Sequence, residues 1–226
     1  MTTCNNCNNQ IQNKFCSFCG QSIAMNGKIN LKHFLIEFFH SIFHTGGGLF
    51  YTLKLLFFKP EIVLNGYLSG KRKVFFSPIK FFLITTIIYI SSIHFVNKGI
   101  NDYQTKTIEY YIKNYKYLMI FGPVLIAGFI NWIIYKKKKL SYTENFIVSI
   151  YIFSGIYLIS SFYMLLNYFA NLKMIYIGII IEIIFYSYAM SRFYNKNKVI
   201  VMIINTLLYL IIIFLFYLPI ILTAKK

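Results

Sequence analysis

The sequence has few charged residues and very few acidic ones. Only 13% of the 226 residues are charged, and six Asp and Glu residues stand against 23 Lys and Arg residues. Apolar residues make up 58% of the chain and occur in long runs, whereas a soluble domain averages nearer half and places them in periodic patterns. The shortage of charge and the length of the runs exclude an ordinary soluble domain and indicate a membrane protein.

Other features are also missing, and each excludes a class of protein. Residues 1–14 contain no apolar run, so we expect no signal peptide. The apolar runs contain neither a nucleophile–base arrangement nor a pair of acidic metal ligands, which argues against an enzyme. The net charge of +17 would suit nucleic acid, but the lysines cluster beside apolar runs as juxtamembrane residues do. Nucleic acid is therefore not an expected partner.

Long stretches that are almost free of charge predict the membrane spans. Five of them approach the ~30 Å thickness of the hydrocarbon core at about 1.5 Å of rise per residue. Only helices satisfy their backbone hydrogen bonds in lipid. The sequence thus predicts an all-α polytopic membrane protein with about five transmembrane helices, and a kink at Gly122-Pro123. The predicted spans are residues 81–96, 117–135, 146–172, 174–190 and 199–222.

The distribution of Lys and Arg predicts the orientation. With five spans, sixteen of these residues lie on the side of the N-terminus and seven on the other side. Basic residues accumulate in cytoplasmic loops, so we expect a cytoplasmic N-terminus and a C-terminus outside. An error of one span would move the C-terminus to the other side but not the N-terminus.

All four cysteines lie within the first 19 residues, as Cys4-x-x-Cys7 and Cys16-x-x-Cys19. Each pair forms a tight turn that points two sulfurs at one position, and two such turns complete a tetrahedron of thiolates around one zinc ion. Asn8 and Gly20 follow the two pairs, where a residue that tolerates positive φ is expected. The sequence therefore predicts an N-terminal zinc ribbon.

Four protein ligands leave no open position for water, so the predicted zinc ion is structural. The segment is too short for a core, and the metal must supply most of its folding free energy. Two disulfides or a redox Cys-x-x-Cys pair are alternatives, but disulfides need an oxidising compartment and this end is expected in the cytoplasm. A protein partner is expected to bind through the ribbon.

Between ribbon and spans, residues 31–43 carry an apolar stripe of helical period, which predicts an amphipathic helix lying in the membrane interface. The predicted domains are a ribbon at 1–24, a juxtamembrane region at 25–78 and a transmembrane domain at 79–226. One face of the connector carries His33, Glu37, His40 and His44. Such a set can hold a second metal ion with an open position, or form a plain polar face at the lipid headgroups.

Two further charged features lie at and within the spans. Lys71, Arg72 and Lys73 precede the first span and are expected to attract anionic headgroups at about 1 kcal/mol per charge, or to act simply as a topogenic signal. Glu182 lies in the middle of the fourth span, where a charged carboxylate is costly. We expect it to serve as a proton or cation site, or as a neutral carboxyl between helices, with amide or hydroxyl partners such as Asn131, Asn167, Asn205 or tyrosines.

The order of several short motifs resembles an uncharacterised bacterial family in which an N-terminal zinc ribbon precedes several spans. The resemblance covers about the first 80 residues, and it implies architecture but no activity. One departure is Thr45-Gly46-Gly47, where charged residues are expected. The resemblance rests on the four cysteines with Gly20-Gln21, then Phe43-His44, Gly48-Leu49, Thr52-Leu53-Lys54, Pro60, Tyr67-Leu68 and Gly70-Lys71-Arg72.

These features favour a membrane-anchored zinc-ribbon protein that works by binding, as a regulatory or assembly module at the inner face of the bacterial cytoplasmic membrane. One alternative is a small proton- or ion-coupled transporter that uses Glu182. Another is a membrane metalloenzyme that uses His33, His40 and His44, which requires a second metal ion.

Overall fold

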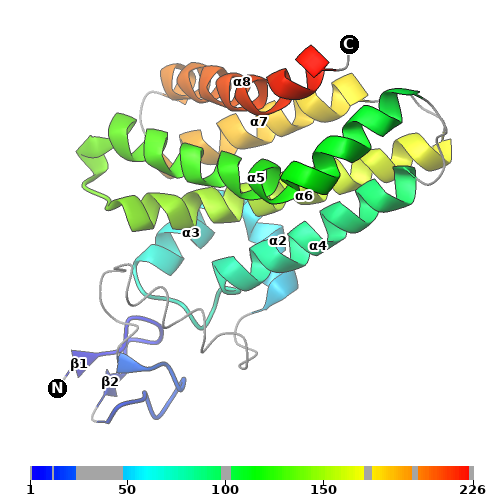
Figure 1. Ribbon diagram of the computed structural model, residues 1–226. Coiled ribbons are helices and arrows are strands. Elements are labelled where there is room, and N and C mark those ends of the chain that lie inside the picture. The colour runs from blue at the N-terminus through cyan, green and yellow to red at the C-terminus, as the bar shows by residue number, and fades with distance from the viewer. Residues whose placement is uncertain are drawn as a thin grey trace.

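A computed structural model of the chain places a small N-terminal ribbon at one end of a bundle of long helices (Figure 1). The structure describes residues 2–11, 13–23, 48–97, 103–170, 175–194 and 198–223. The predicted fold class, an all-α polytopic membrane protein, is confirmed. The predicted connector helix of residues 31–43 lies outside the described residues.

Two short hairpins form the ribbon. β1 (Thr2–Thr3) pairs antiparallel with β2 (Gln10–Ile11), and Phe15 bridges to Ser22 in the second hairpin. Among the described residues of the ribbon, the buried apolar cluster consists of two cysteines and Ile11. The ribbon therefore has hardly any core apart from its cysteines.

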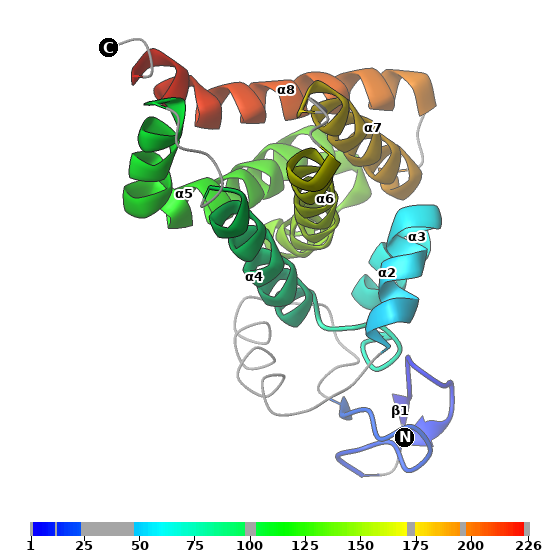
Figure 2. The same cartoon turned by 90° about the vertical axis from the view of Figure 1, so that its right-hand side faces the viewer.

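Among the described residues, four helices are long and apolar enough to cross a membrane. They are α4 (Pro78–Asn97), α5 (Tyr103–Ile134), α6 (Tyr142–Ala170) and α7 (Ile175–Tyr194). The fifth predicted span is also helical, as α8 (Lys198–Thr223), with a shorter apolar stretch at Ile200–Leu215. Figure 2 looks nearly along α6 and α7, whereas α8 lies across them, so α8 crosses these helices at a steep angle.

α6 is the central helix of the bundle, packed against α4, α5 and α7. Its start is fixed by a capping box, in which the Glu144 amide donates to Ser141 Oγ at 3.2 Å and the Ser141 amide donates to Glu144 Oε2 at 2.8 Å. The helix begins at Tyr142, before the predicted span at residue 146, because a capping carboxylate belongs to the first helical turn but not to an apolar run.

α5 is longer than the span predicted for it. Its apolar part, Tyr117–Ile134, agrees with the predicted span at 117–135, but the helix begins at Tyr103. Polar residues continue a helix outside lipid as readily as apolar ones, so the end of an apolar run does not mark the end of a helix. Pro123 lies inside α5, and Figure 2 shows this helix bent. The kink at Gly122-Pro123 itself stays a prediction.

Two short helices, α2 (Leu49–Phe58) and α3 (Pro60–Leu68), pack beside α6 and α7. Pro60 begins α3, where its missing amide hydrogen has no cost. A turn over residues 69–77, here called the α3–α4 turn, then leads into the first span. The Tyr151 hydroxyl of α6 donates to the Phe76 carbonyl of this turn at 2.6 Å, and the Phe76 amide donates to Thr52 Oγ1 at 2.8 Å.

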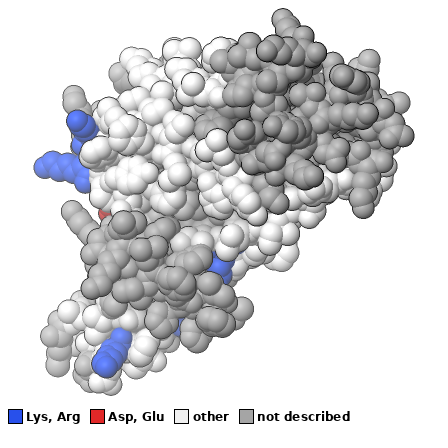
Figure 3. All heavy atoms as spheres, viewed as in Figure 1, with Lys and Arg blue, Asp and Glu red and all other residues white. Residues whose placement is uncertain are grey.

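The described basic side chains gather toward one end of the molecule. On the face shown in Figure 3, Lys and Arg appear on the ribbon, at the lower edge of the helices and at the left edge of the bundle, and the white surface between these places carries none. The short 3₁₀ helix η2 (Lys136–Lys138), which joins α5 to α6, lies at the same end of the bundle as the ribbon (Figure 1). The ribbon and the α5–α6 connection therefore lie on the same side of the spans.

Candidate metal centre and buried acid

Each Cys-x-x-Cys pair forms a turn of the same design. The Asn8 amide donates to the Cys4 carbonyl at 2.8 Å, and the Gly20 amide donates to the Cys16 carbonyl at 2.7 Å. Asn8 has a φ of 62° and Gly20 a φ of 68°, which confirms the expected positive φ after each pair. Because the two turns repeat one geometry, they present their sulfurs to each other in equivalent ways.

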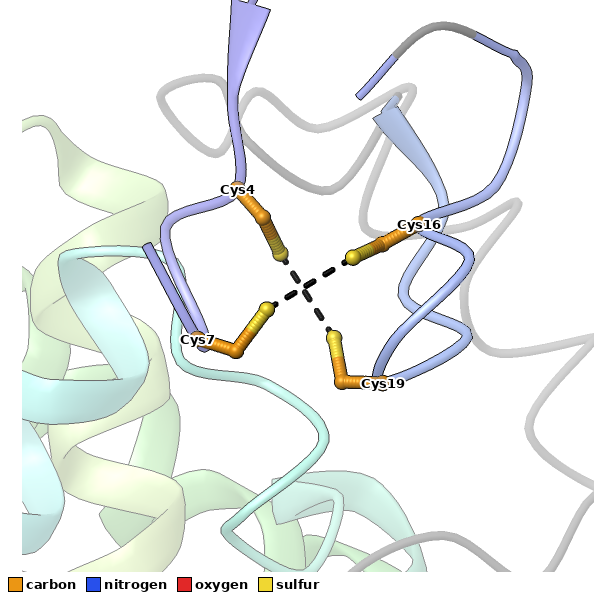
Figure 4. A group of neighbouring side chains, drawn as sticks. All are labelled: Cys4, Cys7, Cys16 and Cys19. Carbon is orange, nitrogen blue, oxygen red and sulfur yellow. Dashed lines mark hydrogen bonds between the residues drawn. The ribbon is translucent and has the colours of Figure 1, made fainter. Parts of the chain in front are cut away.

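The four sulfur atoms converge on one position (Figure 4). The Sγ atoms of Cys4 and Cys19 are 3.6 Å apart, those of Cys7 and Cys16 are 3.5 Å apart, and all four lie within 4.8 Å of one another. A regular tetrahedron of thiolates with zinc–sulfur bonds of about 2.3 Å has edges of about 3.8 Å. The cluster therefore fits one tetrahedral metal ion, and the four cysteines predicted from the sequence are brought together.

The backbone prepares one of these sulfurs for ligation. Backbone amides of Cys19 and Phe18 donate to the Cys16 sulfur and lower the pKa of that thiol to about 6, despite its burial. The Asn9 amide acts in the same direction on Cys7, but burial and the neighbouring thiols raise the pKa of Cys7 to about 12. Backbone donors that lower the pKa of a thiol favour the thiolate, which is the form that binds a metal ion.

The ribbon is attached to the bundle through the α3–α4 turn. The Gln21 side-chain amide donates to the Gly70 carbonyl at 2.7 Å, and Gln21 is 1% exposed. Asn5, between the first two cysteines, donates to the Ser69 carbonyl at 3.2 Å. Gly70 has a φ of 98°, and a Cβ there would lie 2.9 Å from the Asn5 amide, so this approach requires glycine. The docking residues flank the cysteines, which links the metal geometry to the docking contact.

The predicted headgroup residues lie in the same turn. Arg72 is buried, and its guanidinium lies 5.9 Å from the centroid of the Tyr67 ring. Lys71 and Lys73 are exposed, but Lys73 Nζ also lies beside the ribbon, 2.6 Å from the place where a Cβ on Gly20 would stand. Lys73 is thus close to the second cysteine turn, and the contact of these residues with headgroups stays a prediction.

The histidine face lies outside the described residues, so the structure does not test it. His33, Glu37, His40 and His44 all fall in the segment 24–47. Among the described residues, the four cysteines are the group of His, Cys, Asp and Glu residues that lie close enough together to hold a metal ion.

Glu182 is buried in the bundle between α6, α7 and α8. Its Oε1 accepts a hydrogen bond from Ser160, and its Oε2 accepts one from the Tyr209 hydroxyl at 2.9 Å. Tyrosine was an expected partner and is confirmed, whereas Ser160 was not predicted. Among the described residues, no basic side chain forms an ion pair with Glu182. Both carboxyl oxygens are thus held by hydroxyl groups rather than by a cation.

Sequence reasoning missed the pairing within a second group of polar side chains in the bundle, and it named Asn205 only as a partner of Glu182. The Tyr135 hydroxyl donates to Asn205 Oδ1 at 2.9 Å, and the Tyr194 hydroxyl donates to Asn145 Oδ1 at 2.6 Å. The rings of Tyr135 and Tyr194 stack with centroids 3.7 Å apart. The available signal was a four-residue spacing of polar residues within apolar runs, as between Asn205 and Tyr209.

Comparison with known proteins finds one family model that matches a part of the chain. Residues 47–90 match the model of a family described as a protein of unknown function, DUF3667. The matched segment contains α2, α3 and the α3–α4 turn and ends inside α4, so it includes the turn on which the ribbon docks. The match overlaps the later part of the resemblance found in the sequence, from Gly48 to Arg72, and does not include the four cysteines. No curated protein and no solved structure matches the chain.

Proposed function

We propose that this chain is a membrane-anchored zinc-ribbon protein that acts by binding, as a regulatory or assembly module at the cytoplasmic face of the membrane. The observation that carries the proposal is the closed cluster of four cysteine sulfurs, in a ribbon docked on the α3–α4 turn that leads into the first span. Cys4, Cys7, Cys16 and Cys19 would hold one zinc ion. Bound there, zinc supplies folding free energy and leaves no coordination position for a substrate.

A ribbon that binds a partner needs an accessible surface and a connection to the rest of the protein. Phe15 and Phe18, on the second cysteine turn, are 62% and 77% exposed and offer an aromatic surface of the kind enriched in protein interfaces. Gln21 lies a few residues further and reaches the α3–α4 turn. A partner that engages the ribbon would therefore act on a unit that is hydrogen-bonded to the turn leading into the first span.

The distribution of basic residues supports the cytoplasmic orientation. Lys136 and Lys139, at the α5–α6 connection, are exposed on the same side of the spans as the ribbon. Basic residues concentrate in cytoplasmic loops. Fusing green fluorescent protein or alkaline phosphatase to the N-terminus tests the orientation. We expect fluorescence and no phosphatase activity, and the reverse result would place the ribbon outside.

The metal is tested with full-length protein purified in detergent. We expect about one zinc ion per chain, bound by four ligands, and its loss in the double variant Cys16→Ser, Cys19→Ser. Ser17→Ala, an exposed position between these cysteines, is the matched control and should keep the zinc. A double variant that retains one zinc per chain contradicts the proposal at its first step.

The same measurement bears on the histidine face. A metalloenzyme built on His33, His40 and His44 requires a second ion, so about two zinc ions per chain, one of which survives loss of Cys16 and Cys19, would support that alternative. One ion per chain that is lost in the cysteine variant argues against it.

A further inference from the structure

Three of the buried polar atoms that have no hydrogen-bond partner among the described residues lie on α5, α7 and α8. They are Asn131 Oδ1 on α5, the Tyr186 hydroxyl on α7 and Asn205 Nδ2 on α8. The three residues are at most 1% exposed. Buried polar atoms in proteins almost always bond to protein or to ordered water. An acceptor, a hydroxyl and an amide donor together suit water, which donates and accepts, better than a cation.

These residues are neighbours in the fold. The Asn131 amide lies beside the Tyr186 hydroxyl, although it does not reach hydrogen-bond geometry. Tyr135, one helical turn after Asn131, donates to Asn205 Oδ1 at 2.9 Å. The three unpaired atoms therefore belong to one polar group that joins α5, α7 and α8.

On its inner side this polar group reaches Glu182. The ring of Tyr186 stacks on that of Tyr209, with centroids 4.9 Å apart and an angle of 24° between the planes. The Tyr209 hydroxyl donates to Glu182 Oε2 at 2.9 Å. Glu182 and Tyr186 are four residues apart on α7, as are Asn205 and Tyr209 on α8, so both helices turn one polar face inward.

On its outer side the group reaches the lysine-rich end of the bundle. Tyr135 stacks on Tyr194, whose hydroxyl donates to Asn145 Oδ1 at 2.6 Å. The Asn145 amide in turn donates to the carbonyl of Ser141 at 2.9 Å, and Ser141 is exposed. Lys138 lies at this end, with its ammonium 5.6 Å from the centroid of the Tyr194 ring.

We propose that ordered water held by Asn131, Tyr186 and Asn205 connects Glu182 to the lysine-rich end of the bundle, so that its carboxyl group exchanges protons with the aqueous phase on that side. This access route does not depend on the zinc ribbon and goes beyond the binding function proposed above. It would give the membrane domain a proton-accessible acid in the middle of the bilayer.

Protons are conserved along this route. When Glu182 is protonated, an aqueous hydronium ion gives one proton to the outermost water, each water passes one proton inward, and the last O–H bond forms on the carboxylate. The aqueous phase loses one proton and Glu182 gains one. Deprotonation reverses each transfer, and no bond other than O–H forms or breaks.

A second route, by which protons would reach Glu182 from the lipid-facing side, has to be distinguished from the interior route. An apolar groove of about 370 Å³ lies between α6 and α7, lined by residues that include Phe162, Tyr163 and Ile181. Tyr163 also interacts with Glu182, so a proton could in principle arrive from this groove. The groove is lined almost entirely by carbon atoms and offers no chain of polar groups, which favours the interior route.

The test is hydrogen–deuterium exchange of the Glu182 carboxyl group, followed by infrared spectroscopy of full-length protein in lipid nanodiscs. The carboxylic C=O band is assigned by its absence in Glu182→Gln and is brought to full intensity by acidification. After transfer to D₂O we expect the band to shift quickly in the wild type. Tyr186→Phe removes one hydroxyl group without changing the shape of the core, and it should slow the exchange about tenfold.

Matched variants show whether the effect belongs to the route. Tyr188→Phe makes the same change two residues away, where the hydroxyl bonds to the Phe58 carbonyl at 2.7 Å, and should exchange like the wild type. Asn131→Leu should slow exchange as Tyr186→Phe does, with folding checked by the zinc content and melting temperature. A wild-type band that never shifts, equal rates in Tyr186→Phe and wild type, or slowing in Tyr163→Phe alone would each overturn the proposal.

Discussion

In the ribbon, four sulfur atoms take the place of a core, whereas the bundle packs aromatic and aliphatic side chains around a few polar ones. Cys4, Ile11 and Cys16 are the buried apolar residues among the described part of the ribbon. The bundle buries a continuous cluster that runs from α2 to α8, including Leu56 and Tyr151, both 0% exposed. The two regions should therefore fail independently, the ribbon when the metal is removed and the bundle when its packing is damaged.

The largest expected effect comes from removing the metal. Structural zinc contributes on the order of 10 kcal/mol to the folding of such small units, so a strong chelator should unfold the ribbon. Trypsin would then cleave after Lys14, while the melting temperature of the helices changes little. If chelation makes the chain cleavable at Lys14 and also markedly lowers the melting temperature of the bundle, the two regions are not separate.

The reverse experiment damages the bundle alone. Leu56→Ala removes a fully buried side chain and should lower the free energy of unfolding of the bundle by about 2 to 5 kcal/mol. Thermal unfolding in detergent measures this, and the zinc content should stay unchanged. Ile87→Ala, at a 64% exposed position on α4, is the control and should have little effect. Loss of zinc in Leu56→Ala would show that the ribbon depends on the bundle.

An intermediate effect is expected at the contact between the two regions. Gln21→Ala leaves the Gly70 carbonyl without its buried donor, which costs about 1 to 3 kcal/mol. Amide hydrogen exchange should accelerate in the α3–α4 turn, while zinc stays bound. Gln10→Ala, at an exposed position of β2, should leave exchange in the turn as it is in the wild type. Equal exchange in both variants would mean that Gln21 does not hold the ribbon.

The smallest effect is expected at Asn8 and Gly20, the residues with positive φ that follow the two cysteine pairs. Gly20→Ala forces a Cβ into a left-handed backbone conformation beside Lys73 Nζ, at a cost of about 1 kcal/mol. Competition with a chromogenic chelator should show roughly fivefold weaker zinc binding. Asn8→Gly relaxes the equivalent position of the first turn and should bind at least as tightly as the wild type. Weaker binding in Asn8→Gly than in Gly20→Ala would contradict the equivalence of the two turns.

The same comparison shows why some features could be predicted from the sequence and others could not. The cysteine cluster depends on local spacing, since two Cys-x-x-Cys turns with Asn8 and Gly20 behind them fix four sulfurs within 19 residues. The apolar runs likewise predict helices. Their ends were predicted less well, because Glu144 caps α6 and polar residues extend α5 without belonging to an apolar run.

Contacts between segments that are distant in the chain could not be predicted from the sequence. The hydrogen bond from Gln21 to Gly70 joins residues 49 positions apart, and no local sequence pattern predicts it. Ser160 as a partner of Glu182, and the stacked pair of Tyr135 and Tyr194, depend on how α5, α6, α7 and α8 pack. When the helices pack, polar residues that are far apart in the sequence come into contact with one another. A single sequence shows that each of them interrupts an apolar run, but not which of them will be partners.

The central claim is that four cysteine sulfurs hold one zinc ion in a closed ribbon on the membrane domain. X-ray absorption at the zinc edge of the purified full-length protein tests it most directly. The account predicts about one zinc ion per chain with four sulfur ligands at about 2.3 Å. A zinc ion with nitrogen or oxygen ligands in its inner sphere, or protein that holds no zinc while its cysteines are paired as disulfides, would contradict the account.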